Sequence, residues 1–131
     1  MTTIDTTRRW PVISFRIVAT GVATLVLLQA ALAGSFLSGN FESLAAHARN
    51  GGMTTAALLL QTAVAALAWR MGSGAVQLMV ASLAQTLVAA VLIPLGHHRI
   101  LTVHVPLAVL LAIGVLIVAA RSWRSESSEI R

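Results

Sequence analysis

The chain has 131 residues, of which 57% are hydrophobic and 10% are charged, with no cysteine and a formal net charge of +5. A single water-soluble domain of this length could not hide so much apolar surface, so the bilayer must be part of its solvent. The absence of cysteine excludes disulfides, iron–sulfur clusters and thiolate metal sites. Nucleic acid is not an expected partner, because the arginines lie at the ends of apolar runs; anionic lipid headgroups suit them better.

Apolar runs of membrane-spanning length follow one another along the chain. Trp10-Pro11 marks the entry to the first run, and Arg16 is expected to snorkel back to the headgroups. Short turns at 70–74 and 96–101 make neighbouring helices antiparallel. The sequence therefore predicts an all-α, polytopic membrane protein, one domain forming an antiparallel bundle of four transmembrane helices. The expected helices are 12–36, 51–69, 75–95 and 102–120, with polar tails at 1–10 and 121–131 and an outer loop at 37–50.

The N-terminal region imitates a secretory signal. Arg8-Arg9 precedes an apolar run that reaches the small-residue triplet Ala31-Leu32-Ala33. That run is longer than a signal-peptide core, and the downstream segments are equally apolar. We therefore expect an uncleaved first helix.

The arginines predict the orientation. Under the positive-inside rule, the side with more arginines faces the cytoplasm. This places both termini in the cytoplasm, the chain in the cytoplasmic (inner) membrane of a bacterium, and the histidine-bearing loops outside. The cytoplasmic set is Arg8, Arg9, Arg16, Arg70, Arg121, Arg124 and Arg131, against Arg49 and Arg99 outside.

The layout repeats as two tandem helix pairs. In the first pair, Gln29 in a membrane helix is followed by a turn and then His47; in the second, Gln85 is followed by a turn and then His104. Each histidine is followed by an apolar run that closes on Trp-Arg. The matched positions predict that His47 and His104 face one another across the bundle.

The other two histidines, His97 and His98, lie in a turn and are expected to be solvated. His47 and His104 begin helices and are expected to point inward. The residues on the same helical faces are small or apolar and leave room for a flat ring system. These are Gly51, Thr54 and Thr55 after His47, and Ala108 and Leu111 after His104.

This arrangement is typical of a haem held by two imidazoles in a helical bundle. His47 and His104 are the predicted ligands of haem b, with Gln29 and Gln85 as candidate neighbours. Zinc is disfavoured, because a tetrahedral site needs more ligands than two histidines and a loop glutamate supply. The alternatives are that both histidines cap helices, or that His97 or His98 substitutes as a ligand. The propionates would meet residues of the outer loops, namely Arg49, Arg99, His97 or His98.

The segment Gln29 to Gly39 (QAALAGSFLSG), with Glu42, His47 and the stretch His104 to Ala108 (HVPLA), resembles one half of haem A synthase. That family duplicates a four-helix unit, and the resemblance implies haem ligation by His47 on the second helix and His104 on the fourth. The family has glutamate three residues before its first histidine and arginine directly after it; Glu42 lies five before and Ala48 intervenes here. A cysteine pair and a second half are missing, so the resemblance implies haem binding without methyl-group oxidation.

Three functions compete. The first is a haem b protein for electron transfer or haem handling, without independent catalytic activity, served by a redox partner or quinone. The second is a cofactor-free accessory or assembly subunit. The third, a small multidrug exporter, ranks last because such exporters need an intramembrane acid. The acids of this chain lie in tails or a loop instead: Asp5, Glu42, Glu126 and Glu129. A homodimer or a larger membrane complex is left open.

Overall fold

The structure, a computed structural model, describes residues 6–124, with side chains from residue 10 onward. This part of the chain is helical throughout apart from its turns, and each helix contains a stretch long and apolar enough to cross a bilayer. The predicted fold class is therefore confirmed: the protein is an all-α, multi-pass membrane protein built as a four-helix bundle. The helices are α1 (Thr6–Leu37), α2 (Glu42–Arg70), α3 (Val76–His97) and α4 (Leu101–Arg124).

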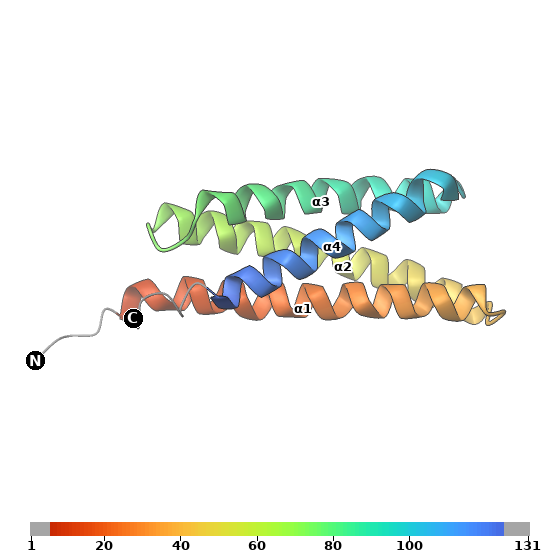
Figure 1. Cartoon of the computed structure of the whole chain (residues 1–131), viewed down its shortest axis with the longest axis horizontal. Helices are drawn as coiled ribbons and strands as arrows, with labels where there is room; N and C mark the ends of the chain where they lie inside the picture. The colour runs from red at the N-terminus through yellow and green to blue at the C-terminus, as the bar shows by residue number, and fades with distance from the viewer. Residues whose placement is uncertain (1–5, 125–131) are drawn as a thin grey trace, which may run out of the picture.

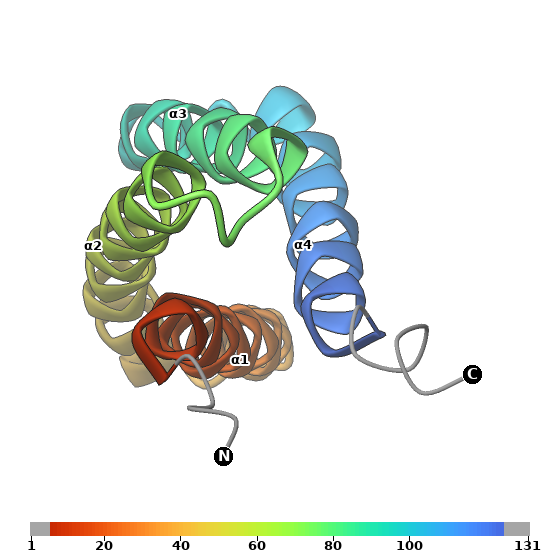
Figure 2. The same ribbon diagram turned by 90° about the vertical axis from the view of Figure 1, so that its left-hand side faces the viewer.

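The helices close into a ring in chain order (Figure 2). Helix α1 packs against α2 and α4, and α3 packs against the same two helices, whereas the diagonal pairs have no Cα atoms within 8 Å. Helix α4 crosses the bundle obliquely, from beside α3 at its start to beside α1 at its end (Figure 1). A side chain on α4 can therefore meet different neighbours at the two ends of the bundle.

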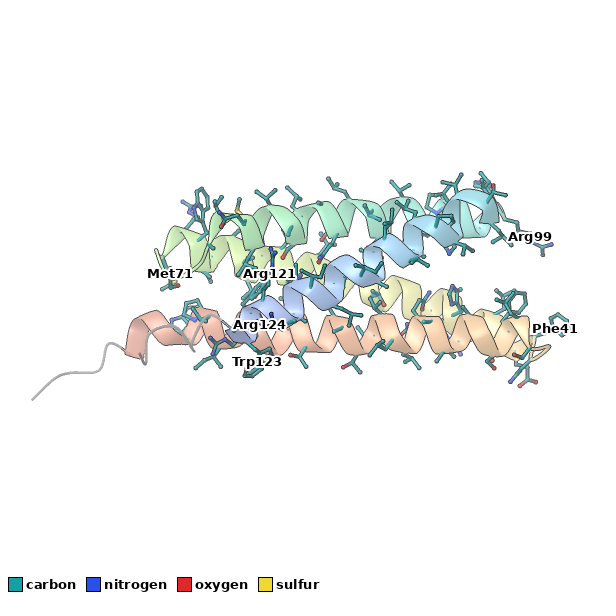
Figure 3. All side chains as sticks on the ribbon, in the orientation of Figure 1. Phe41, Met71, Arg99, Arg121, Trp123 and Arg124 are labelled. Carbon is teal, nitrogen blue, oxygen red and sulfur yellow. The ribbon has the colours of Figure 1, made fainter. Side chains whose placement is uncertain are left out.

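The two ends of the bundle differ in their residues (Figure 3). We call the end with turns 38–41 and 98–100 the histidine end; it carries Phe41 and Arg99. The opposite end, where α1 begins, α2 turns into α3 and α4 finishes, is the arginine end. It carries the described arginines Arg16, Arg70, Arg121 and Arg124.

Helix α2 begins at Glu42, although the sequence predicts a loop as far as Asn50. The turn needs only residues 38–41, where Gly39 adopts a φ of 100° that favours glycine. The polar residues that follow find partners on α1: Ser43 Oγ lies 2.8 Å from Ser35 Oγ, and the buried Asn50 bonds to α1 as well. His47 therefore lies inside α2 rather than ahead of it.

The interior contains polar side chains, whereas large apolar side chains face outward. Leu60 and Leu110 are exposed, while Gln61 and Ser82 are buried. Gln61 Nε2 donates to Ser82 Oγ at 3.0 Å and to Gln85 Oε1 at 3.2 Å, which joins α2 to α3. This arrangement suits a protein surrounded by hydrocarbon, where polar groups must be satisfied inside the bundle.

Arg16 does not snorkel outward as the sequence predicts. Its side chain is only 7% exposed, and its Nε donates to the main-chain oxygen of Ser122 at 2.8 Å. The guanidinium carbon also lies 5.4 Å from the centre of the Trp123 ring. Because the last carbonyls of a helix have no intrahelical partner, this arginine caps α4 and joins it to α1. Gln77, by contrast, is exposed at the start of α3.

Candidate functional site

His47 and His104 are both half-buried and lie close together near the histidine end of the bundle. His47 lies on α2 and His104 on α4, two helices whose backbones do not come into contact. Their ring centroids are 6.5 Å apart and the ring planes are inclined by 55°. The two histidines that the repeat singles out are thus brought together across the diagonal of the bundle.

The imidazole of His47 is held by α1. Its Nδ1 lies 3.2 Å from the main-chain oxygen of Gln29, which can only accept, so Nδ1 carries the proton. The Gln29 side-chain nitrogen lies 3.1 Å from His47 Nε2 and 3.0 Å from the main-chain oxygen of His47. Nε2 therefore accepts a hydrogen bond through its lone pair, and the ring is neutral.

Asn50 fixes the orientation of the Gln29 amide. Asn50 Nδ2 donates to Gln29 Oε1 at 2.6 Å and to the main-chain oxygen of Leu25 at 2.9 Å. If His47 Nε2 gained a proton, it would face the amide N–H of Gln29, and turning that amide over would place its nitrogen against Asn50 Nδ2. The network thus accommodates the neutral imidazole, which is the form that binds metals.

His104 is held by α3 in a similar way. Its Nδ1 lies 3.0 Å from the main-chain oxygen of Leu92, so this nitrogen also carries the proton. The ring rests against Gly96, where a Cβ atom would lie 3.0 Å from His104 Cε1. Among the described residues, Nε2 of His104 has no hydrogen-bond partner.

Both histidines therefore donate Nδ1–H to a main-chain carbonyl, and His47 presents an unprotonated Nε2. Metal-binding histidines have this arrangement, because the second nitrogen is almost always anchored by a carbonyl, a carboxylate or water. Within residues 6–124, no group of three or more His, Cys, Asp or Glu side chains gathers to form a site. The donor set thus suits a metal whose remaining positions are filled by another ligand, such as a macrocycle.

The other predicted site residues of α2 lie close to His47. A Cβ on Gly51 would lie 3.2 Å from the Gln29 side-chain nitrogen, so this glycine allows the close approach of α1. The hydroxyls of Thr54 and Thr55 donate to carbonyls of their own helix, at Asn50 and Gly51 respectively. They line the helix face without offering a free polar group.

On α4, Leu111 belongs to a buried apolar cluster, and Ala108 packs against that cluster. Arg49 and Arg99 are exposed toward the histidine end, with Arg99 in the left-handed conformation at a φ of 58°. His97 and His98 are also exposed. Their rings pack edge to face, with ring centroids 5.5 Å apart.

Gln85 does not approach the histidines, although the repeat pairs it with Gln29. Its Oε1 accepts from Gln61, and its side-chain nitrogen lies near Gly114. The carbonyl that holds His104 belongs to Leu92, two helical turns or about 10 Å further along α3. The two helix pairs thus share a layout but differ in side-chain contacts.

Sequence reasoning misses three contributors to the site: Asn50, the Leu92 carbonyl and Gly96. Asn50 could have been found, because it lies three residues after His47 and so shares its helical face. Nothing in the sequence marks Leu92 or Gly96, since their contact with His104 depends on where α4 crosses α3.

Comparison of the chain with protein-family models, curated proteins and solved structures found no match. The fold and the site therefore define the class: a four-helix, multi-pass membrane protein with a pair of neighbouring, half-buried histidines on α2 and α4.

Proposed function

We propose that the protein binds haem b through His47 and His104, and that it transfers electrons or handles haem in the membrane. The observation that carries this proposal is the pair of facing imidazoles with ring centroids 6.5 Å apart. Metal–imidazole bonds are about 2.0–2.1 Å long, so two rings on opposite sides of one metal have centroids roughly 6 Å apart. The resemblance to one half of haem A synthase supports the same pair of ligands.

The surroundings also suit this group. Haem b supplies one-electron chemistry, and its potential is set by the axial ligands, their hydrogen bonds and the burial of the site. Here the chain anchors each Nδ1 on a carbonyl and places the buried side chains of Leu92 and Leu111 in the same core. Arg49 and Arg99 are exposed near this end and would meet carboxylates at the interface.

We also propose the cytoplasmic membrane as the location, with both termini in the cytoplasm and the histidine end outside. The support is the distribution of arginines, since Arg49 and Arg99 alone among the described arginines belong to the histidine half of the bundle.

The first test is a visible absorption spectrum of the detergent-purified protein, oxidised and then reduced with dithionite. We expect a sharp Soret band and, on reduction, the split bands of a six-coordinate low-spin haem. A colourless protein that also takes up no added haemin would refute the proposal.

The Gln29 amide has to leave His47 Nε2 before that nitrogen can bind a metal. We therefore expect Gln29→Ala to strengthen haemin binding by about fivefold to tenfold, because a net hydrogen bond of about 1 kcal/mol no longer competes. Haemin titration followed at the Soret band measures the change.

Gln85→Ala is the matched control, because it removes a buried membrane glutamine that does not touch the histidines. It should leave haemin affinity within twofold of the original protein. Equal affinities for the two variants would mean that Gln29 does not obstruct the site.

A cofactor-free accessory subunit is the second candidate, and one observation favours it. Among the described residues, every buried side-chain nitrogen and oxygen already has a hydrogen-bond partner within the chain. In a cofactor-free subunit, the histidines and glutamines would serve to join helices by hydrogen bonds. The same spectrum separates the two functions.

A further inference from the structure

A cavity of about 510 Å³ lies at the arginine end, between the start of α3 and the end of α4. The oblique course of α4, which leaves α3 as it approaches α1, separates the two helices here (Figure 1). The cavity is lined by Ala75, Gln77, Leu78, Arg121 and Arg124.

The lining combines positive charge with apolar surface. Arg121 and Arg124 are three residues apart on α4 and so lie on one face, near the end of that helix (Figure 3). Leu78 and Ala75 supply apolar walls from α3, and Gln77 adds a polar group. An arginine pair is suited to a phosphate, since the planar guanidinium can donate two parallel hydrogen bonds to its oxygens.

The charge around the cavity is positive among the described side chains. Arg70 lies at the same end, and the acid among residues 10–124, Glu42, lies at the opposite end. The two guanidinium groups in the lining suit the cavity to a negatively charged group.

The position of the cavity, at the same end as two exposed tryptophans, indicates that the anion belongs to a lipid. Trp69 and Trp123 are exposed at this end, where tryptophans of membrane proteins lie at the headgroup level. The exposed apolar side chains of Val80 and Ile117 continue from it along α3 and α4, where acyl chains can lie. Basic pockets between transmembrane helices are suited to anionic headgroups.

We propose that this cavity binds the phosphate headgroup of an anionic glycerophospholipid, with Arg121 and Arg124 as the phosphate ligands. The proposal does not depend on haem binding, because the cavity lies at the opposite end of the bundle from the histidines.

The test is a lipid titration of the detergent-purified full chain, followed by native mass spectrometry. The probes are phosphatidylglycerol and phosphatidylcholine with the same acyl chains. We expect preferential binding of one phosphatidylglycerol molecule. The double variant Arg121→Gln/Arg124→Gln should weaken its binding by about 25-fold, at about fivefold for each arginine.

Arg70→Gln is the matched control, since it removes an exposed arginine from the same end but not from the cavity lining. It should change phosphatidylglycerol affinity less than twofold. A loss equal to that of the double variant would indicate diffuse attraction to the surface and overturn the proposal, as would undiminished binding by the double variant.

Two further arms keep the result interpretable. Arg121→Lys/Arg124→Lys keeps the charge and should retain the preference for phosphatidylglycerol; loss of that preference would overturn a site based on positive charge. Inorganic phosphate in excess should leave the lipid bound. Displacement of the lipid by phosphate would show a site for small anions instead.

Discussion

Replacing His47 or His104 with alanine is expected to abolish the six-coordinate low-spin haem spectrum while the protein remains inserted in the membrane. Each imidazole would supply one of the two axial bonds of the proposed haem, so either substitution would remove one bond. We expect haemin affinity to fall by more than about 100-fold. Loss of a residue that only hydrogen-bonds to a metal ligand already costs about 10–100-fold in affinity, and loss of the ligand itself should cost more. Absorption spectra and membrane fractionation measure the two effects.

His97→Ala/His98→Ala is the control for these variants, because it removes two histidines that are exposed near the same end. It should leave the spectrum unchanged. Low-spin haem that persists in the His47→Ala/His104→Ala double variant but disappears in the control would transfer the ligand role to the turn.

Gly96→Leu is expected to displace His104 and to weaken the α3–α4 contact. Even a Cβ atom at this position would lie 3.0 Å from His104 Cε1 and 3.3 Å from Nδ1, the nitrogen that donates to the Leu92 carbonyl. Overpacking of this kind costs about 1–3 kcal/mol of stability. Haemin affinity should fall at least about tenfold, because the ring can no longer hold its anchored position.

Gly52→Leu provides the comparison, since a Cβ atom on Gly52 would meet nothing within 4 Å. Thermal unfolding in detergent, followed by circular dichroism, compares the two variants without haem. Haemin titration then compares the haemin affinities of the two variants. Equal stability and equal affinity would mean that the His104 ring is not held against Gly96.

The sequence alone predicts the class of fold and the grouping of charges. Hydropathy is a local and additive property, so the apolar runs reveal four membrane helices whatever their packing. The repeated layout also singles out His47 and His104. In the structure the centroids of their rings are 6.5 Å apart. Whether they bind haem stays a prediction.

The tertiary structure decides what each polar residue does. Helix α2 starts at Glu42 because Ser43 and Asn50 find hydrogen-bond partners on α1, and a polar segment without such partners looks like a loop. Arg16 turns inward because the end of α4 offers a carbonyl within reach. Neither partner is visible in the local sequence.

The same reason explains why Gln29 reaches a histidine and Gln85 does not. Both occupy matched places in the sequence, but α1 and α2 pack closely beside His47, whereas α4 crosses α3 obliquely and places His104 against Leu92 and Gly96. Sequence position thus identified the histidines of the site. The crossing of the helices selected their neighbours, because contacts between distant segments depend on packing angles that no local pattern encodes.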